Sequence, residues 1–149
     1  MIVKATLKDV NTIYKLINQT IKSDFLLPRT KENIAESLRD FLVYKEKSSI
    51  KGVVALQLYT PELAEIRTLA VAKASQKKGI GTKLVAAAIA EAKKIGVKKV
   101  FVLTLSKDWF EKQDFEVVEK QTLPEKIFKD CIFCPKLNDC HEVALTYRI

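Results

Sequence analysis

The spacing of hydrophobic positions changes near residue 6. Residues 2–5 form a short apolar run that is typical of a strand. Thr6 and Asp9 have the spacing of a capping box, the arrangement that begins many helices. Apolar residues then recur at helical spacing, at Val10, Ile13, Ile17 and Ile21. The pattern predicts a strand over residues 2–5 and a first helix after it.

A second helix and a pair of strands follow. Pro28 disfavours helix at the residue before it, so the first helix ends ahead of this point. Thr30 is a suitable N-cap for the second helix. The predicted buried face of that helix holds Ile34, Leu38 and Phe41. Residues 41–44 and 50–59 are largely apolar and are joined by the polar segment 45–49, which predicts an antiparallel hairpin.

The centre of the chain is predicted to form a strand, a glycine turn and a long helix. Strand 62–71 leads into the turn at residues 76–82, and Gly96 stands where a left-handed residue ends a helix. The predicted buried face of the helix comprises Ile80, Leu84, Ala88, Ala92 and Ile95. The apolar run 100–105 suits a central strand covered on both faces. It should lie parallel to strand 62–71, because the helix is then a βαβ crossover.

The C-terminal part holds shorter predicted elements. An amphipathic helix over residues 108–112 precedes a strand at 115–118, and residues 142–147 form a closing strand. Residues 123–140 show the least regular pattern. The order of elements predicts an α/β fold, a mixed central sheet flanked by helices, in one domain over residues 1–149.

Composition narrows the class of protein. The longest uncharged apolar run, residues 84–90, is far too short for a membrane helix, and the first residues lack the pattern of a signal peptide. We therefore expect a cytoplasmic protein that binds no membrane and whose three cysteines are reduced. The net charge of +8 favours anionic partners, but the lysines are dispersed and no nucleic-acid-binding motif is present. We expect small-molecule partners and no nucleic acid, and the oligomeric state, a homodimer included, stays open.

The strand, turn and helix around residues 76–82 form a candidate anion site. Backbone N–H groups and the positive end of the helix dipole converge at such a turn. The turn is not a P-loop, and Gly79 and Gly81 lack the third glycine of a dinucleotide fingerprint. The spacing Gln76-x-x-Gly79-x-Gly81, in this order of elements, resembles the acetyl-CoA motif of the GNAT-type N-acetyltransferases. The alternative is a turn whose glycines only ease packing.

The resemblance implies the GNAT fold and acetyl-CoA as the acetyl donor. In that family the amides of the turn bind the CoA pyrophosphate, and the pantetheine arm adds beside the strand. Carried onto this chain, the pyrophosphate site comprises Gln76, Lys77, Lys78, Gly79, Ile80, Gly81 and Thr82. The backbone contacts to pantetheine come from Leu69, Ala70 and Val71. Glycine at 79 and 81 would keep side chains out of the space between the amides and the phosphate.

Glu65 is the candidate general base. An acceptor amine is mostly protonated at neutral pH, so a carboxylate near the strand must take a proton from it. Strand alternation places Glu65, Arg67, Leu69 and Val71 on one face if no bulge intervenes. The segment also resembles histone-type members of the superfamily, in which the glutamate at this position is the base. The alternative is a solvated ion pair between Glu65 and Arg67.

The leaving group of the implied reaction is a thiolate. Many members of the family protonate it with a tyrosine, but Phe110 occupies that position here. A thiol with a pKa of about 8.5 is a tolerable leaving group without an acid. The amide of Val71 is a candidate donor to the oxygen that gains charge.

Further segments resemble the amino-acid N-acetyltransferases that make N-acetylglutamate for arginine synthesis, in their short, stand-alone form. They lie at residues 26–30, 40–43, 64–67, 102–104, 108–110 and 123–126. Glutamate has two carboxylates, which a guanidinium binds bidentately, so Arg29 and Arg67 are the candidate substrate-binding residues. The alternatives are an exposed Arg29 and an Arg67 paired with Glu65. Rival functions are acetylation of a protein N-terminus, a polyamine or an antibiotic, and CoA binding without turnover.

The cysteines form a cluster near the C-terminus. Cys131 and Cys134 have metal-ligand spacing, and Cys140 and His141 follow. Neighbouring residues such as Cys140 and His141 point apart in extended chain, so four ligands from this segment fit a tetrahedral site poorly. We assign no metal and favour small buried side chains over a zinc or redox role.

Overall fold

The computed structural model describes residues 1–20, 29–123 and 143–149, without the side chains of Thr20 and Gln121. Its strands are β1 (Ile2–Lys4), β2 (Phe41–Glu46), β3 (Ser49–Thr60), β4 (Leu63–Val71), β5 (Lys99–Thr104), β6 (Glu116–Val118) and β7 (Val143–Arg148). Its α-helices are α1 (Val10–Thr20), α2 (Lys31–Glu36), α3 (Ile80–Ile95) and α4 (Lys107–Glu111). Short 3₁₀-helices lie at Leu7–Asp9, Leu38–Asp40, Lys73–Ser75 and Lys120–Thr122.

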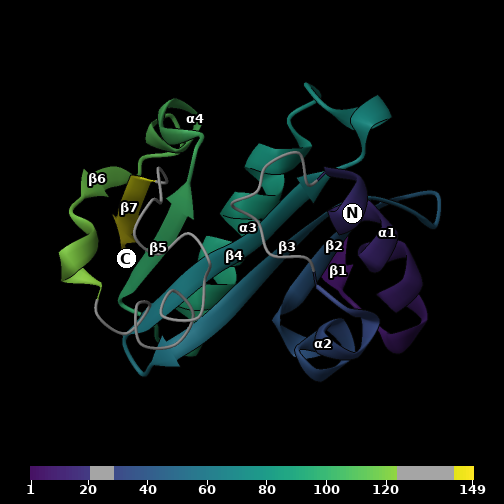
Figure 1. The fold of residues 1–149 in the computed structure, drawn as a ribbon, viewed down its shortest axis with the longest axis horizontal. Coiled ribbons are helices and arrows are strands. Elements are labelled where there is room, and N and C mark those ends of the chain that lie inside the picture. The colour runs from purple at the N-terminus through teal and green to yellow at the C-terminus, as the bar shows by residue number, and fades with distance from the viewer. Residues whose placement is uncertain (21–28, 124–142) are drawn as a thin grey trace.

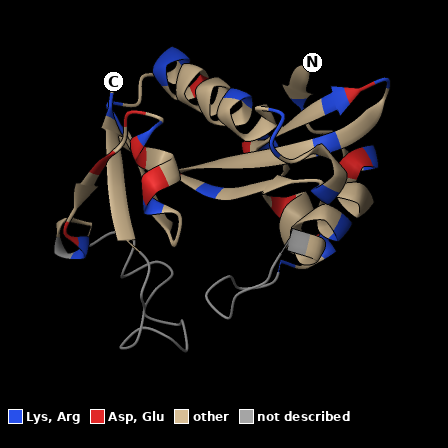
Figure 2. Cartoon of the chain, turned by 90° about the horizontal axis from the view of Figure 1, so that it is seen from above, with Lys and Arg blue, Asp and Glu red and all other residues tan. Residues whose placement is uncertain are grey.

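The strands form one mixed sheet of order β1-β2-β3-β4-β5-β7-β6. Strands β4 and β5 are parallel, as the crossover through α3 predicts, and the other described pairs are antiparallel. Figure 2 shows α3 on one side of the sheet and α1 and α2 on the other. Separate apolar cores lie under these two layers. The predicted α/β class with a mixed sheet and flanking helices is confirmed.

The sequence explains most helix ends. The Thr6 backbone N–H donates to Oδ2 of Asp9 at 2.8 Å, and the hydroxyl of Thr30 accepts from the N–H of Asn33 at 3.0 Å. Gly96 ends α3 with a φ of 97°, and the N–H of Val97 bonds back to the carbonyl of Ala92 at 2.9 Å. The predicted caps are therefore confirmed.

Four apolar positions differ from the prediction. Leu38 lies outside α2, which ends at Glu36, and Phe41 is buried as the first residue of β2 instead of on a helix. Ile95 is 50% exposed, because the chain reverses at Gly96 and Val97 occupies the core. Leu105 lies beyond the end of β5 and is also exposed. In each case the element ends earlier than the apolar pattern does.

Two irregularities in the β3–β4 ladder shape the centre of the sheet. The register shifts at Arg67, between the pairs Thr68–Ala55 and Ile66–Leu56. It shifts again at Tyr59, between the pairs Leu58–Ala64 and Thr60–Leu63. Arg67 and Tyr59 are thus the extra residues of two β-bulges, features that bend a strand and redirect its side chains.

Strands β4 and β5 separate soon after they meet. Their parallel ladder comprises three residue pairs and ends at Glu65 and Phe101. Figure 1 shows the two strands diverging from this end. Among the described strands, none continues the ladder along the β5-facing edge of β4 from residue 66 to 71. Within the described residues, this part of β4 is therefore an open edge of the kind that an extended ligand can join.

Candidate active site

The turn between β4 and α3 has a backbone that its glycine permits. Gly79 is the N-cap of α3 with a φ of 80°, and a Cβ built there meets no atom within 4 Å. Lys77 also has a positive φ, of 65°. Residues with a side chain rarely adopt this conformation, so the backbone of the turn favours glycine at 79, and the space beside it is open.

The first backbone amides of α3 precede the hydrogen-bond ladder of the helix. The N–H of Lys83 bonds to the carbonyl of Gly79 at 3.1 Å, so the amides of Ile80, Gly81 and Thr82 precede the first such bond. The exposed lysines of the turn include Lys77 and Lys78. Donors, dipole and cations therefore coincide at this end of the site, which is the chemistry that binds a phosphate.

Gln76 and Gly81 have structural roles that the motif did not predict. The side-chain amide of Gln76 donates to the carbonyl of Val71 at 3.2 Å and so closes the turn. A Cβ at Gly81 would stand 3.3 Å from Cζ2 of Trp109. The close approach of α4 therefore also limits the space at residue 81, and the role of Gly81 in leaving room for the phosphate stays a prediction.

The side chains of β4 do not alternate as predicted. Leu69 and Val71 pack into the core beneath α3, together with Ile66. Ala70 packs into the opposite core, and Thr68 bonds with Arg29 on that side. We predicted a shared face for Glu65, Leu69 and Val71 on the condition that no bulge intervenes. The bulge at Arg67 breaks that condition and changes the alternation.

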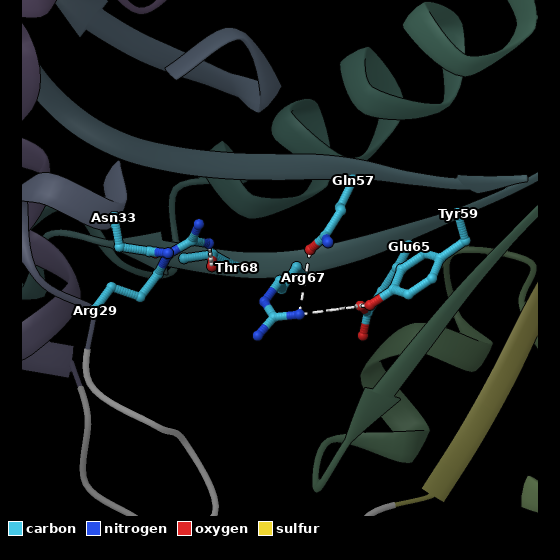
Figure 3. A network of polar contacts seen from close by, with 7 residues as sticks. All are labelled: Arg29, Asn33, Gln57, Tyr59, Glu65, Arg67 and Thr68. Carbon is cyan, nitrogen blue, oxygen red and sulfur yellow. Dashed lines mark hydrogen bonds and ion pairs between the residues drawn. The ribbon is translucent and has the colours of Figure 1, made fainter. Parts of the chain in front are cut away.

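Glu65 lies in a network of side chains at the end of the β4–β5 ladder (Figure 3). It is 3% exposed, and its Oε1 accepts from the hydroxyl of Tyr59 at 2.9 Å. Nη1 of Arg67 lies 4.0 Å from the same oxygen, and it donates to Oε1 of Gln57 at 3.2 Å and to the Tyr59 hydroxyl at 3.4 Å. The interpretation of Glu65 and Arg67 as a solvated pair is wrong, since the carboxylate is buried.

Arg29 lies further along β4, on the side of α1 and α2. Its Nε donates to Oδ1 of Asn33 at 2.8 Å and its Nη1 to the hydroxyl of Thr68 at 3.0 Å. The guanidinium also stacks over the ring of Phe41, 4.9 Å from the centroid. Arg29 is half-buried, so the alternative of an ordinary exposed arginine is wrong.

A fourth charged group, Asp40, lies within electrostatic reach of both arginines. Burial raises the pKa of Asp40, although the charges of Arg29, Lys4 and Arg67 act to lower it. Two guanidinium groups and two carboxylates therefore lie near one stretch of β4. The negative charge of Asp40 offsets part of the positive charge of the two arginines.

Phe110 is a core residue of α4. It is 4% exposed and makes edge contacts with the rings of Trp109 and Phe115, at centroid distances of 4.8 Å and 5.4 Å. It offers no proton at this position. The cluster of Cys131, Cys134, Cys140 and His141 lies outside the described residues. Within residues 1–20, 29–123 and 143–149, no group of three or more His, Cys, Asp or Glu is placed to hold a metal.

The sequence did not single out Gln57, Tyr59, Asn33 or Thr68 as members of the site. Gln57 is directly opposite Glu65 in the ladder, so strand alternation with a known register would have identified it. The contact of Tyr59 with Glu65 likewise depends on the register of β3 against β4, for which the sequence holds no clear signal. In the described part of the chain, no helix is long and apolar enough to cross a membrane.

Comparison with known proteins agrees with this geometry. The model of the acetyltransferase (GNAT) family matches residues 8–115. An uncharacterised N-acetyltransferase of Chlorobaculum tepidum is 40% identical over 141 residues, which cover 95% of this chain and 91% of the relative. The amino-acid acetyltransferase of Neisseria meningitidis is 30% identical over 82% of this chain, which spans only 28% of that longer protein.

Two solved structures have closely similar folds. N-acetylglutamate synthase of Neisseria gonorrhoeae, complexed with coenzyme A and N-acetyl-glutamate, superposes with a TM-score of 0.88 and 28% identity. The match covers 99% of this chain and 34% of the synthase. A Mycobacterium tuberculosis protein in complex with CoA and NLQ gives a TM-score of 0.86 at 23% identity, covering 100% and 99% of the two chains.

Proposed function

The chain belongs to the acetyltransferase (GNAT) family, and we propose from this premise that it transfers the acetyl group of acetyl-CoA to the α-amino group of L-glutamate. Support for the acceptor comes from the amino-acid acetyltransferases, with which this chain shares 30% identity over 82% of its length. The N-acetylglutamate synthase of similar fold carries N-acetyl-glutamate in its own structure. This chain spans only 28% of the first protein and 34% of the second, so their activity comes to this chain as a proposal.

Acetyl-CoA supplies an activated thioester. The amides of residues 80–82 and the side chains of Lys77 and Lys78 are suited to its pyrophosphate, because they combine open donors with positive charge. The open edge of β4 from Leu69 to Val71 is suited to the amide groups of pantetheine, which can pair with a strand. This geometry supports the cofactor residues that the motif predicts.

The observation that carries the glutamate proposal is the placement of two guanidinium groups along β4, with Arg67 beside the buried Glu65 carboxylate and Arg29 further along at Thr68. Arg29 reaches Thr68 of β4, and Arg67 reaches the network around Glu65 (Figure 3). An acceptor with two carboxylates gains from two guanidinium groups, each of which forms charge-assisted hydrogen bonds. Positively charged acceptors such as polyamines are disfavoured by the same groups.

In the proposed reaction Glu65 removes a proton from the α-ammonium group, directly or through water. The nitrogen then forms a bond to the acetyl carbon and releases its second proton to solvent, and the bond from that carbon to sulfur breaks. Solvent protonates the departing thiolate, since Phe110 has no proton to give. The amide of Val71 is the candidate donor to the carbonyl oxygen as its charge grows.

The acceptor is tested by release of CoA thiol with acetyl-CoA and a panel of the twenty amino acids, short peptides and a polyamine. We expect glutamate to give the highest kcat/KM. Release with peptides alone would support an acetyltransferase of protein N-termini. Binding of acetyl-CoA by calorimetry without release for any acceptor would overturn the enzyme assignment.

Matched variants locate the acceptor site. Arg29→Gln and Arg67→Gln should each raise the KM for glutamate by about 10-fold or more, the equivalent of one lost charge-assisted hydrogen bond. Arg39→Gln, which replaces an exposed arginine, is the control. Equal KM values in all three variants would contradict the substrate-binding roles.

A further inference from the structure

Tyr59 binds the Glu65 carboxylate from the neighbouring strand. Its hydroxyl donates to Oε1 at 2.9 Å, and its ring lies against Phe101 with the centroids 5.6 Å apart. Tyrosine carries its hydroxyl on a rigid ring that only two torsions move. A hydroxyl fixed in this way also fixes the direction of the carboxylate that it binds (Figure 3).

The backbone explains how Tyr59 reaches Glu65. Gln57 stands directly opposite Glu65, and Tyr59 is the extra residue of the bulge that follows. Arg67 is the extra residue of the other bulge in the same ladder. Tyr59 and Arg67 each lie two residues along the chain from the Gln57–Glu65 pair, and both side chains contact Glu65.

The contacts form a chain of donors. Nη1 of Arg67 donates to the Tyr59 hydroxyl at 3.4 Å, and that hydroxyl donates to Glu65. A hydroxyl that accepts from a cation is a stronger donor to the next group. The carbonyl oxygen of the Gln57 side chain accepts from the same Nη1 at 3.2 Å and thereby holds the guanidinium in place.

The groups near Glu65 in the described chain can be named element by element. Strand β3 contributes Gln57 and Tyr59, β4 contributes Arg67, and β5 contributes the apolar Phe101. Two further charged groups come from outside the sheet: Arg29, which precedes α2 and bonds to Thr68, and Asp40, in the 3₁₀-helix before β2. Of these groups, Tyr59 and Arg67 have contacts to the Glu65 carboxylate, and both interactions favour its ionised form.

We propose that Tyr59 is a positioning residue for the base, which keeps Glu65 ionised and directed toward the acceptor amine. The proposal rests on the proposed function, because it takes Glu65 as the base. The Tyr59 proton stays on its oxygen throughout, and the proton of the amine passes to Glu65.

The test compares Tyr59→Phe, Tyr147→Phe and Glu65→Gln in pH profiles of kcat/KM for glutamate. Tyr147 is a matched control, since its ring meets Phe115 at 5.5 Å and 51°, close to the 5.6 Å and 53° of Tyr59 and Phe101. In Tyr59→Phe the carboxylate loses a donor, so the acid limb should move up by about one pH unit. We also expect kcat to fall by about 5- to 10-fold, with the KM for acetyl-CoA unchanged.

The variants distinguish failure of the proposed function from failure of the positioning role of Tyr59. If Glu65→Gln keeps full activity, the base assignment in the proposed function fails. If Glu65→Gln is impaired but Tyr59→Phe behaves like Tyr147→Phe, the positioning role is overturned. Should Tyr59→Phe lose its native circular dichroism, 3-fluorotyrosine at position 59 replaces it. A fluorinated phenol is a stronger donor, so the acid limb should then move to lower pH, and an unchanged limb would overturn the role.

Discussion

The two ends of the β4–α3 unit hold their polar groups by different means. At the Glu65 end, a buried carboxylate is bound by side chains from two strands, Tyr59 and Arg67. At the turn end, the donors are backbone amides, the conformation depends on Gly79, and the cations are exposed lysines. The first end depends on side-chain identity and strand register, and the second depends on backbone conformation and net charge.

The two ends of the β4–α3 unit therefore suit different tasks, proton transfer at the Glu65 end and anion binding at the turn end. Buried side-chain contacts in a low dielectric are strong and insensitive to salt, which suits a group that must hold one proton state. Backbone donors at a helix start bind an anion whatever the neighbouring side chains are. Substitutions at the two ends should therefore change different kinetic constants.

The largest expected effect belongs to the Glu65 end. Glu65→Gln should lower kcat about 100-fold at neutral pH, because general base catalysis contributes at least this much, and less at alkaline pH, where the amine loses its proton to solvent. The KM for acetyl-CoA should stay unchanged. Steady-state kinetics across pH check this, with the exposed Glu62→Gln on the adjoining turn as control. A fall that is equal at all pH values would contradict the base role.

At the turn end, Gly79→Ala should raise the KM for acetyl-CoA about 10-fold with little change in kcat, because the new Cβ strains the amides that hold the phosphate. Gly96→Ala is the matched control, since Gly96 also has a positive φ, 97° against 80°, and an open surrounding. Both variants should lose about 1 kcal/mol of stability in urea unfolding. Equal KM values in the two variants would reject the phosphate site.

The sequence predicted the turn end better than the Glu65 end, and the reason is physical. Glycine spacing and helix caps are local, so Gly79, Thr30 and Gly96 could be assigned from their neighbours alone. The Glu65 network depends on the register of β3 against β4, and a shift of one residue exchanges the faces of a strand. Candidate residues such as Arg67 were identified by charge, but their partners Tyr59 and Gln57 were not.

Added salt should affect the turn end of the β4–α3 unit more than the Glu65 end. The exposed charges of Lys77 and Lys78 are screened within about 8 Å at physiological ionic strength, so the KM for acetyl-CoA should rise with added salt. The double variant Lys77→Gln/Lys78→Gln should raise this KM about 3-fold at low salt and flatten its salt dependence. The matched control is Lys93→Gln/Lys94→Gln, at the other end of α3. If the kcat of the wild type also changed with salt, this would contradict the expectation that the buried contacts around Glu65 are insensitive to salt.

The smallest expected effect concerns Asp40, which lies beside the arginines of the Glu65 end. Its folded pKa is raised by burial above the ordinary value, so the ionised form costs stability in the native state at neutral pH, and this cost disappears as pH falls through the folded pKa. Asp40→Asn should therefore be more stable than the wild type at neutral pH by a fraction of a kcal/mol, with the two converging in acid. Urea unfolding across pH measures the difference. If Asp40→Asn were instead less stable than the wild type at neutral pH, the attraction of Arg29 and Arg67 for the Asp40 carboxylate would outweigh the cost of its burial. These guanidinium groups would then need a resident carboxylate before an acceptor arrives.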